Sequence, residues 1–214
     1  WSNHHQEPTR RPMSFYVMMP MNEHWLHTDE RVDVISSLKM LETALNELDS
    51  DLISWKWIII ATHSALQSAI ACHLGGIGNS LLVAKQEDAE SWLKAHEDGT
   101  PYPEMMMDSF PNLYKKLKKI EIHGYKFSPM GSQGRSIKSV NKFRNEFVHY
   151  MPKGWALEVT GLPRICIDCL DVIRELDEHT INLYWENPSQ HSLFISLLDS
   201  CLNKLMILEK KYGT

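Results

Sequence analysis

Along most of this chain, hydrophobic residues recur every three or four positions, the spacing that places them on one face of an α-helix. Residues 29–48 follow this pattern and begin with acids that suit the positive end of a helix dipole, which predicts an amphipathic helix. Residues 51–74 are apolar on nearly all sides, which predicts a central, buried helix. The GGIG run at 75–78 ends that helix. It lacks the following Lys-Ser/Thr and the preceding strand of a phosphate-binding loop.

The remaining chain carries five more stretches with helical spacing, several of them opened by a proline. They cover 87–96, a segment starting at Pro111, a segment running from Ile137 to Val148, 163–176 and 188–208. Alternation typical of a strand is found only at 155–160, as one possible short strand. We therefore expect an all-α fold, an antiparallel helical bundle with irregular loop insertions. Its single domain would span 29–214, after an N-terminal arm, 1–28, that could include residues foreign to the natural protein.

Composition supports one domain and a reducing compartment. A chain of 214 residues that is 43% hydrophobic can bury one sizeable core. Its four cysteines are scattered among apolar helical positions, which favours core packing and a cytoplasmic location over a disulfide framework. The Cys166-x-x-Cys169 pair could also bind a metal, but it has no partner pair, so we expect core packing and no metal or other cofactor. Polar residues such as His63 interrupt the longest apolar stretch, which favours a buried helix over a membrane span.

Charge is distributed unevenly along the chain. The formal net charge is −5, yet residues 110–153 contain ten basic and two acidic residues, a local balance of +8. This excess has two interpretations: a solvated helix face, or a footprint for a polyanion such as RNA. Under the second interpretation, the candidate RNA-binding residues are Lys115, Lys116, Lys118, Lys119, Arg135, Lys138, Lys142 and Lys153.

Within this basic region, the segment RNEFVH at 144–149 holds three side chains suited to phosphate chemistry. Asn145 and His149 are four residues apart and share one helix face, and the long side chain of Arg144 can curl toward them. A neutral histidine can take a proton from a ribose 2′-OH or return one to a leaving 5′-oxygen. A guanidinium can stabilise the phosphorane formed between these steps. Arg144, Asn145 and His149 are therefore the candidate catalytic residues.

A structural interpretation of the same residues stays open. His149 could cap the end of its helix, and Arg144 could form an ion pair with Glu146 or with an acid from another helix. The spacing itself is not specific, because Arg174 and His179 repeat it among acidic neighbours that would repel a phosphate. His63 and Gln67, on the buried helix, could reach the 144–149 site or satisfy each other in the core.

The segments WKWIIIATHSALQSAIACHL (55–74) and FRNEFVHYMPKGW (143–155) resemble bacterial proteins of the HEPN family. Members carry an Arg, usually followed by a polar residue, with a His five to seven positions after the Arg, on a late helix of a small all-α bundle. The resemblance covers about 29–210, and its specific part is RNEFVH. It departs from toxins that are silenced by nucleotide transfer to a tyrosine two positions after the His, because Met151 takes that place here and Tyr150 is adjacent to the His.

The resemblance implies a metal-independent endoribonuclease, acting as a toxin or antiviral effector, whose active site forms between two protomers. Arg144 would then stabilise the scissile phosphate, Asn145 would orient it and His149 would be the acid and base. RNA, a second copy of the chain and a cognate antitoxin or regulatory protein are the partners it implies. The alternative is a non-catalytic helical module of the same fold that binds a nucleotide, RNA or a protein partner through the basic face.

Overall fold

The computed structural model describes residues 26, 28–76, 80–149, 154–180 and 185–213, and this part of the chain forms seven α-helices and no β-strand. The expected all-α class is confirmed. The helices are α1 (Glu30–Glu47), α2 (Ser54–Gly75), α3 (Gln86–Glu97), α4 (Phe110–Lys119), α5 (Gln133–His149), α6 (Leu162–His179) and α7 (Pro188–Tyr212), with a short 3₁₀ helix at Ser80–Leu82. Most of the proposed arm, 1–28, lies outside the described residues, as does Lys153.

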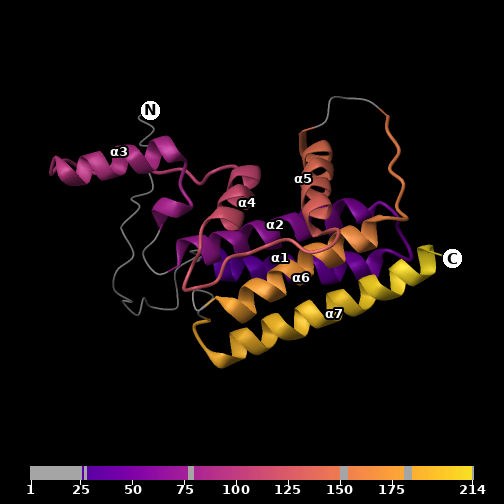
Figure 1. Cartoon of the computed structure of the whole chain (residues 1–214). Coiled ribbons are helices and arrows are strands. Elements are labelled where there is room, and N and C mark those ends of the chain that lie inside the picture. Colours follow the sequence, from indigo (N-terminus) through magenta and orange to yellow (C-terminus); the bar gives the residue numbers. More distant parts are fainter. Residues whose placement is uncertain (1–25, 27, 77–79, 150–153, 181–184, 214) are drawn as a thin grey trace, which may run out of the picture.

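Four long helices, α1, α2, α6 and α7, lie alongside one another and form the body of the molecule (Figure 1). The central helix is α2, whose Ile58, Ile59 and Leu66 are fully buried, as its uniformly apolar sequence predicts. Cys166 and Cys169 of α6 are also completely buried and pack as small hydrophobic side chains. One hydrophobic core therefore includes residues of the first and the last helix, α1 and α7.

The prediction of a possible short strand at 155–160 is wrong. Residues 154–159 have no regular secondary structure and pair with no described strand, and a lone strand leaves its backbone groups without the ladder that would stabilise it. Their alternating apolar residues instead face α2 and α5 and line a cleft described below. The alternation thus reflects one buried side of a loop.

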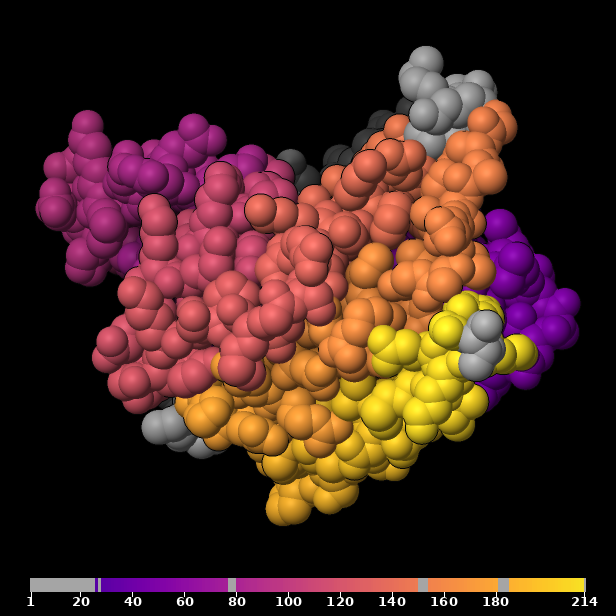
Figure 2. All heavy atoms as spheres, turned by 45° about the vertical axis from the view of Figure 1, so that its right-hand side comes forward, coloured from indigo at the N-terminus to yellow at the C-terminus, as the bar shows by residue number. Residues whose placement is uncertain are grey.

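Helix α5 stands across the bundle rather than along it (Figure 1). Its first half packs on α2 and α6 and buries Ile137 and Val140, whereas no residue from 141 to 149 is fully buried. The expected apolar stripe is therefore only partly covered, and Val148 remains 45% exposed. The end of α5 lies at the upper right of Figure 2, where it projects from the body. The RNEFVH segment lies on this projecting half.

By length and composition alone, two of the described helices, α2 and α7, are apolar enough to cross a membrane. Most of α2 is covered by other helices of the bundle, and the core helix of a soluble protein passes the same test. These two helices are weak evidence for a membrane span.

Candidate functional site

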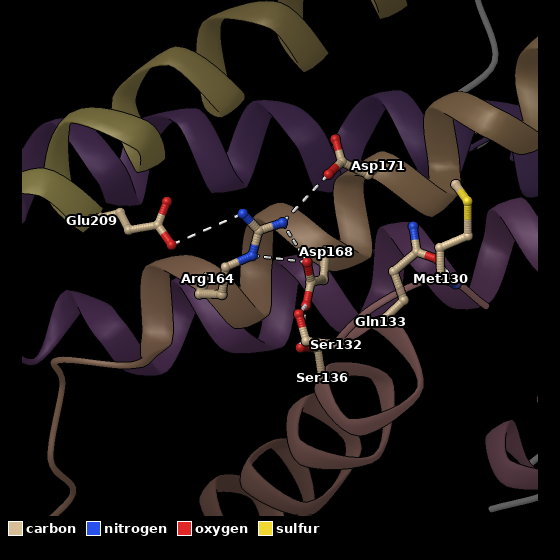
Figure 3. A network of polar contacts seen from close by, with 8 residues as sticks. All are labelled: Met130, Ser132, Gln133, Ser136, Arg164, Asp168, Asp171 and Glu209. Atoms are coloured by element: carbon tan, nitrogen blue, oxygen red, sulfur yellow. Dashed lines mark hydrogen bonds and ion pairs between the residues drawn. The ribbon is translucent and has the colours of Figure 1, made fainter.

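A buried carboxylate anchors the start of α5 to α6. Asp168 of α6 accepts hydrogen bonds from the hydroxyls of Ser132 and Ser136, both at 2.6 Å, and from the guanidinium of Arg164 (Figure 3). Burial alone would raise the pKa of Asp168, but these hydrogen bonds outweigh burial and hold the pKa below its usual value. The carboxylate therefore stays charged and fixes the direction in which α5 leaves the bundle.

Replacing this carboxylate should destabilise the fold substantially. Asp168→Ala leaves two serine hydroxyls without their acceptor in a buried position, so we expect the free energy of unfolding to fall by about 2–4 kcal/mol in urea titrations. Asp171→Ala is the matched control, because Asp171 is half-exposed and lies 3.7 Å from the same Arg164. This substitution should lower the free energy of unfolding by less than about 1 kcal/mol. Equal losses in the two variants would contradict the anchoring role.

The three candidate catalytic side chains lie together at the end of α5. Nη1 of Arg144 donates a hydrogen bond to Oδ1 of Asn145 at 3.0 Å and lies 3.5 Å from Nε2 of His149. Among the described residues, Arg144 forms no ion pair with a carboxylate, so the expected alternative of a pair with Glu146 is not what the structure shows. Because no carboxylate neutralises it, the guanidinium of Arg144 is available to bind an external anion.

A basic stripe extends from this trio along the outer face of α5. Arg135, Lys138, Lys142, Asn145 and His149 are spaced by three, four, three and four residues, so they share one face of the helix. All five are exposed. Because a helix rises 1.5 Å per residue, the stripe covers about 21 Å. Its length and charge suit several consecutive phosphates of a nucleic acid.

Two lysines of α4 take part in local contacts. Helix α4 has little contact with α5. Nζ of Lys116 makes a 2.9 Å ion pair with Asp108 and donates to the carbonyl of Ala84, and Nζ of Lys118 lies over the ring of Tyr114. Lys115 and Lys119 are exposed, and Lys115 contacts Asn112 of its own helix. Part of the basic excess at 115–119 therefore serves local structure.

His63 of α2 contacts the site through a residue that sequence reasoning missed. Its Nε2 lies 3.2 Å from Oδ1 of Asn141, one helical turn before Arg144 and Asn145, and its ring packs on Phe110 at a centroid distance of 4.3 Å. Among the described residues, His63 does not pair with Gln67; it is buried in the core, and its hydrogen bond goes to Asn141 of α5, outside 144–149. Burial lowers the pKa of His63 to about 4; the hydrogen bond to Asn141 opposes this shift, and the charge of Arg144 adds to it.

The second R-x4-H sequence, at Arg174 and His179, is arranged differently. Arg174 forms a 2.6 Å ion pair with Asp199 of α7, whereas the ring of His179 stacks on Tyr125 at 4.6 Å. Each side chain is thus held by a different neighbour. The same spacing places an arginine and a histidine together only on α5.

An apolar cleft of about 530 Å³ lies beside the end of α5, between the start of α2 and the 154–159 segment. The rings of Phe147 and Trp155 form one wall of the cleft, with their centroids 4.9 Å apart. Lys56 is the charged residue that lines the cleft. Leu52 and Ile53, which also line it, are 61% and 60% exposed. A patch of this kind next to a polar site is typical of a surface that binds another molecule.

Comparison with known proteins gives no match: no family model, curated protein or solved structure is significantly similar to this chain. Within the part of the chain that the structure describes, no group of three or more histidine, cysteine or carboxylate side chains is placed to hold a metal ion. The functional conclusion therefore depends on the site itself.

Proposed function

We propose that this protein is a metal-independent endoribonuclease of the HEPN type. The observation that carries the proposal is the 3.5 Å approach of Arg144, a guanidinium without a carboxylate partner, to Nε2 of His149 at the end of an exposed basic stripe. A cation that holds a phosphate beside a group that moves a proton is the minimum equipment for cleaving RNA through its own 2′-hydroxyl.

In the proposed reaction, a histidine takes the proton of the ribose 2′-OH as its oxygen attacks the adjacent phosphorus. The bond from phosphorus to the 5′-oxygen then breaks, and that oxygen receives a proton from a histidine in the imidazolium form. The products are a 2′,3′-cyclic phosphate and a free 5′-hydroxyl. Arg144 stabilises the extra negative charge on the phosphorane, and Asn145, hydrogen-bonded to Arg144, orients the phosphate.

One histidine cannot easily be base and acid in the same step, so we propose that the active enzyme is a homodimer in which two copies of His149 meet. The apolar cleft supports this assembly. Its exposed Leu52 and Ile53, together with Val148 beside His149, provide the apolar surface that a second copy would cover. An enzyme of this type would act as a toxin or an antiviral effector, held in check by a regulatory partner.

A charge placed in this surface should separate the protomers. We expect Ile53→Glu to convert the dimer to a monomer in sedimentation velocity and to abolish cleavage, because a carboxylate would be buried without a partner at the interface. Ile53 is 60% exposed in the single chain, so its folding should be little affected. Leu93→Glu is the matched control, since Leu93 is an exposed apolar residue on the distant α3. A dimer that survives Ile53→Glu would rule out this interface.

The direct test is incubation of the purified protein with mixed single-stranded RNA in excess EDTA, followed by analysis of the fragment ends. Cyclic 2′,3′-phosphates and 5′-hydroxyls are the expected products. Intact RNA, or fragments with 3′-hydroxyl and 5′-phosphate ends, would contradict the proposed reaction. Retained RNA affinity without cleavage would instead favour the binding module, which needs only the exposed basic stripe.

A further inference from the structure

Asn141 occupies a special place on α5, at the point where the helix leaves the bundle. It is half-buried and stands three residues before Arg144 and four before Asn145, so these side chains are neighbours on the helix surface. Residues before it pack on α2 and α6, and residues after it project outward. Asn141 therefore lies at the inner edge of the site.

The side-chain amide of Asn141 is held in one orientation from below. The buried Nε2–H of His63 donates to Oδ1 of Asn141 at 3.2 Å. The His63 ring cannot swing away, because it is 3% exposed and packs on Phe110. With its oxygen engaged, Asn141 presents its amide nitrogen in the remaining direction, and that nitrogen donates to none of the residues that the structure describes.

A neutral His63 suits this arrangement. A histidine that is protonated on one ring nitrogen only can donate to Asn141 without adding a second positive charge beneath Arg144. Burial together with the nearby guanidinium keeps the pKa of His63 at about 4, so the ring is neutral at physiological pH. The pair is thus a fixed, uncharged support for the outer groups.

We propose that Asn141 is an additional phosphate-binding residue of the site, whose amide nitrogen donates to a non-bridging phosphate oxygen held by Arg144, and that His63 is the positioning residue that orients it. This inference rests on the proposed function for the nature of the bound anion. The opposite amide orientation would present an oxygen to the phosphate and repel it, which explains why a buried donor is needed behind Asn141.

The experiment measures two quantities for each variant: cleavage of RNA, and the affinity for a fluorescent single-stranded oligonucleotide with 2′-deoxyribose throughout, which cannot be cleaved by 2′-OH attack. Asn141→Leu keeps the volume and removes the donors, and should raise both KM and the oligonucleotide Kd roughly tenfold. His63→Leu should weaken binding in the same direction, and His63→Gln, which can still donate to Oδ1, should restore it. Gln67→Leu, one turn further along α2, is the matched control and should match the wild type.

Two further measurements distinguish a positioning role of His63 from a merely structural one. The double variant with both leucines should bind no worse than Asn141→Leu alone, because His63 acts only through Asn141. The ¹⁵N shifts of the His63 ring should show a proton on Nε2, and a ring protonated on Nδ1 alone would overturn the inference.

The two proposals fail separately. If cleavage depends on Arg144 and His149 but Asn141→Leu keeps the wild-type KM and Kd, the inference is overturned and the ribonuclease stands. If the wild type cleaves nothing, the proposed function fails, and the affinity for the oligonucleotide alone then tests the inference about Asn141. Weaker binding in Asn141→Leu then supports the phosphate contact, and unchanged binding overturns it.

Discussion

In EDTA, Arg144→Ala and His149→Ala should each lower the rate of RNA cleavage at least a hundredfold. Losing a positioned acid or base typically costs a factor of 10²–10⁴, and losing one stabilising donor of a transition-state anion costs a comparable factor. Neither side chain is needed for packing, because His149 is exposed and, within the described part of the chain, the side-chain hydrogen bonds of Arg144 are to Asn145 and His149. The fold should therefore survive both substitutions, as circular dichroism and thermal unfolding would show.

The chain supplies its own control for this experiment. Arg174→Ala and His179→Ala change the same residue types at the same spacing, but Arg174 is committed to Asp199 and His179 to Tyr125. Both control variants should cleave at the wild-type rate. Equal activity in the Arg144, His149 and control variants would eliminate the proposed site, and a loss in all four would point to a general effect on the fold.

Arg144→Lys refines the same prediction. Lysine keeps the positive charge but lacks the planar pair of donors that lets arginine bind two phosphate oxygens. We expect an intermediate rate if the guanidinium holds the phosphate by two hydrogen bonds. A rate equal to that of Arg144→Ala would mean that geometry, more than charge, matters at this position.

The sequence predicted most of the helices because their positions depend on local patterns. The last helix was expected at 188–208 and is found at Pro188–Tyr212, where the side chain of Asn187 caps the first turn. The central helix was expected to be apolar on all sides and is the core helix of the bundle. Within α5, the spacing along one helix allows Arg144 to approach His149. The spacing alone does not decide this, because Arg174 and His179 share it and are held by other neighbours.

Contacts between distant segments could not be predicted in the same way. The hydrogen bond from His63 to Asn141 joins residues 78 positions apart, and nothing in either local pattern indicates the other. The ion pair of Lys116 with Asp108 likewise depends on how the loop before α4 turns back. The nearest available signal for Asn141 was its place one turn before Arg144, but an asparagine on a helix surface is too common to single out.

Mild acid should destabilise this protein because two of its histidines are buried in the neutral form. His63 and His73 are buried histidines, and burial lowers the pKa of each from 6.5 to about 4; a nearby positive charge adds to the shift, Arg144 for His63 and His123 for His73. Because these pKa values are lower in the folded protein than in the unfolded chain, the unfolded chain binds more protons between pH 6.5 and 4. The stabilisation is therefore complete above pH 6.5 and is lost as the pH falls toward 4.

Each histidine should contribute about 2–3 kcal/mol across this interval, since one pKa unit corresponds to about 1.4 kcal/mol. The two together approach the whole stability of a typical domain, so we expect the protein to unfold cooperatively near pH 4–5. Urea unfolding followed by circular dichroism at several pH values from 7.5 to 4.5 measures this loss directly. A free energy of unfolding that stays constant over this range would contradict the prediction.

Substitution of each histidine assigns the effect. His63→Gln and His73→Gln should each remove about half of the pH dependence, because glutamine keeps a polar group in place but does not titrate. His149→Gln is the matched control, because it removes an exposed imidazole instead of a buried one. Because His149→Gln should also abolish cleavage, the stability profile and the activity profile separate cleanly. Loss of the pH dependence in the His63 and His73 variants would assign the acid limit of the fold to these two buried histidines.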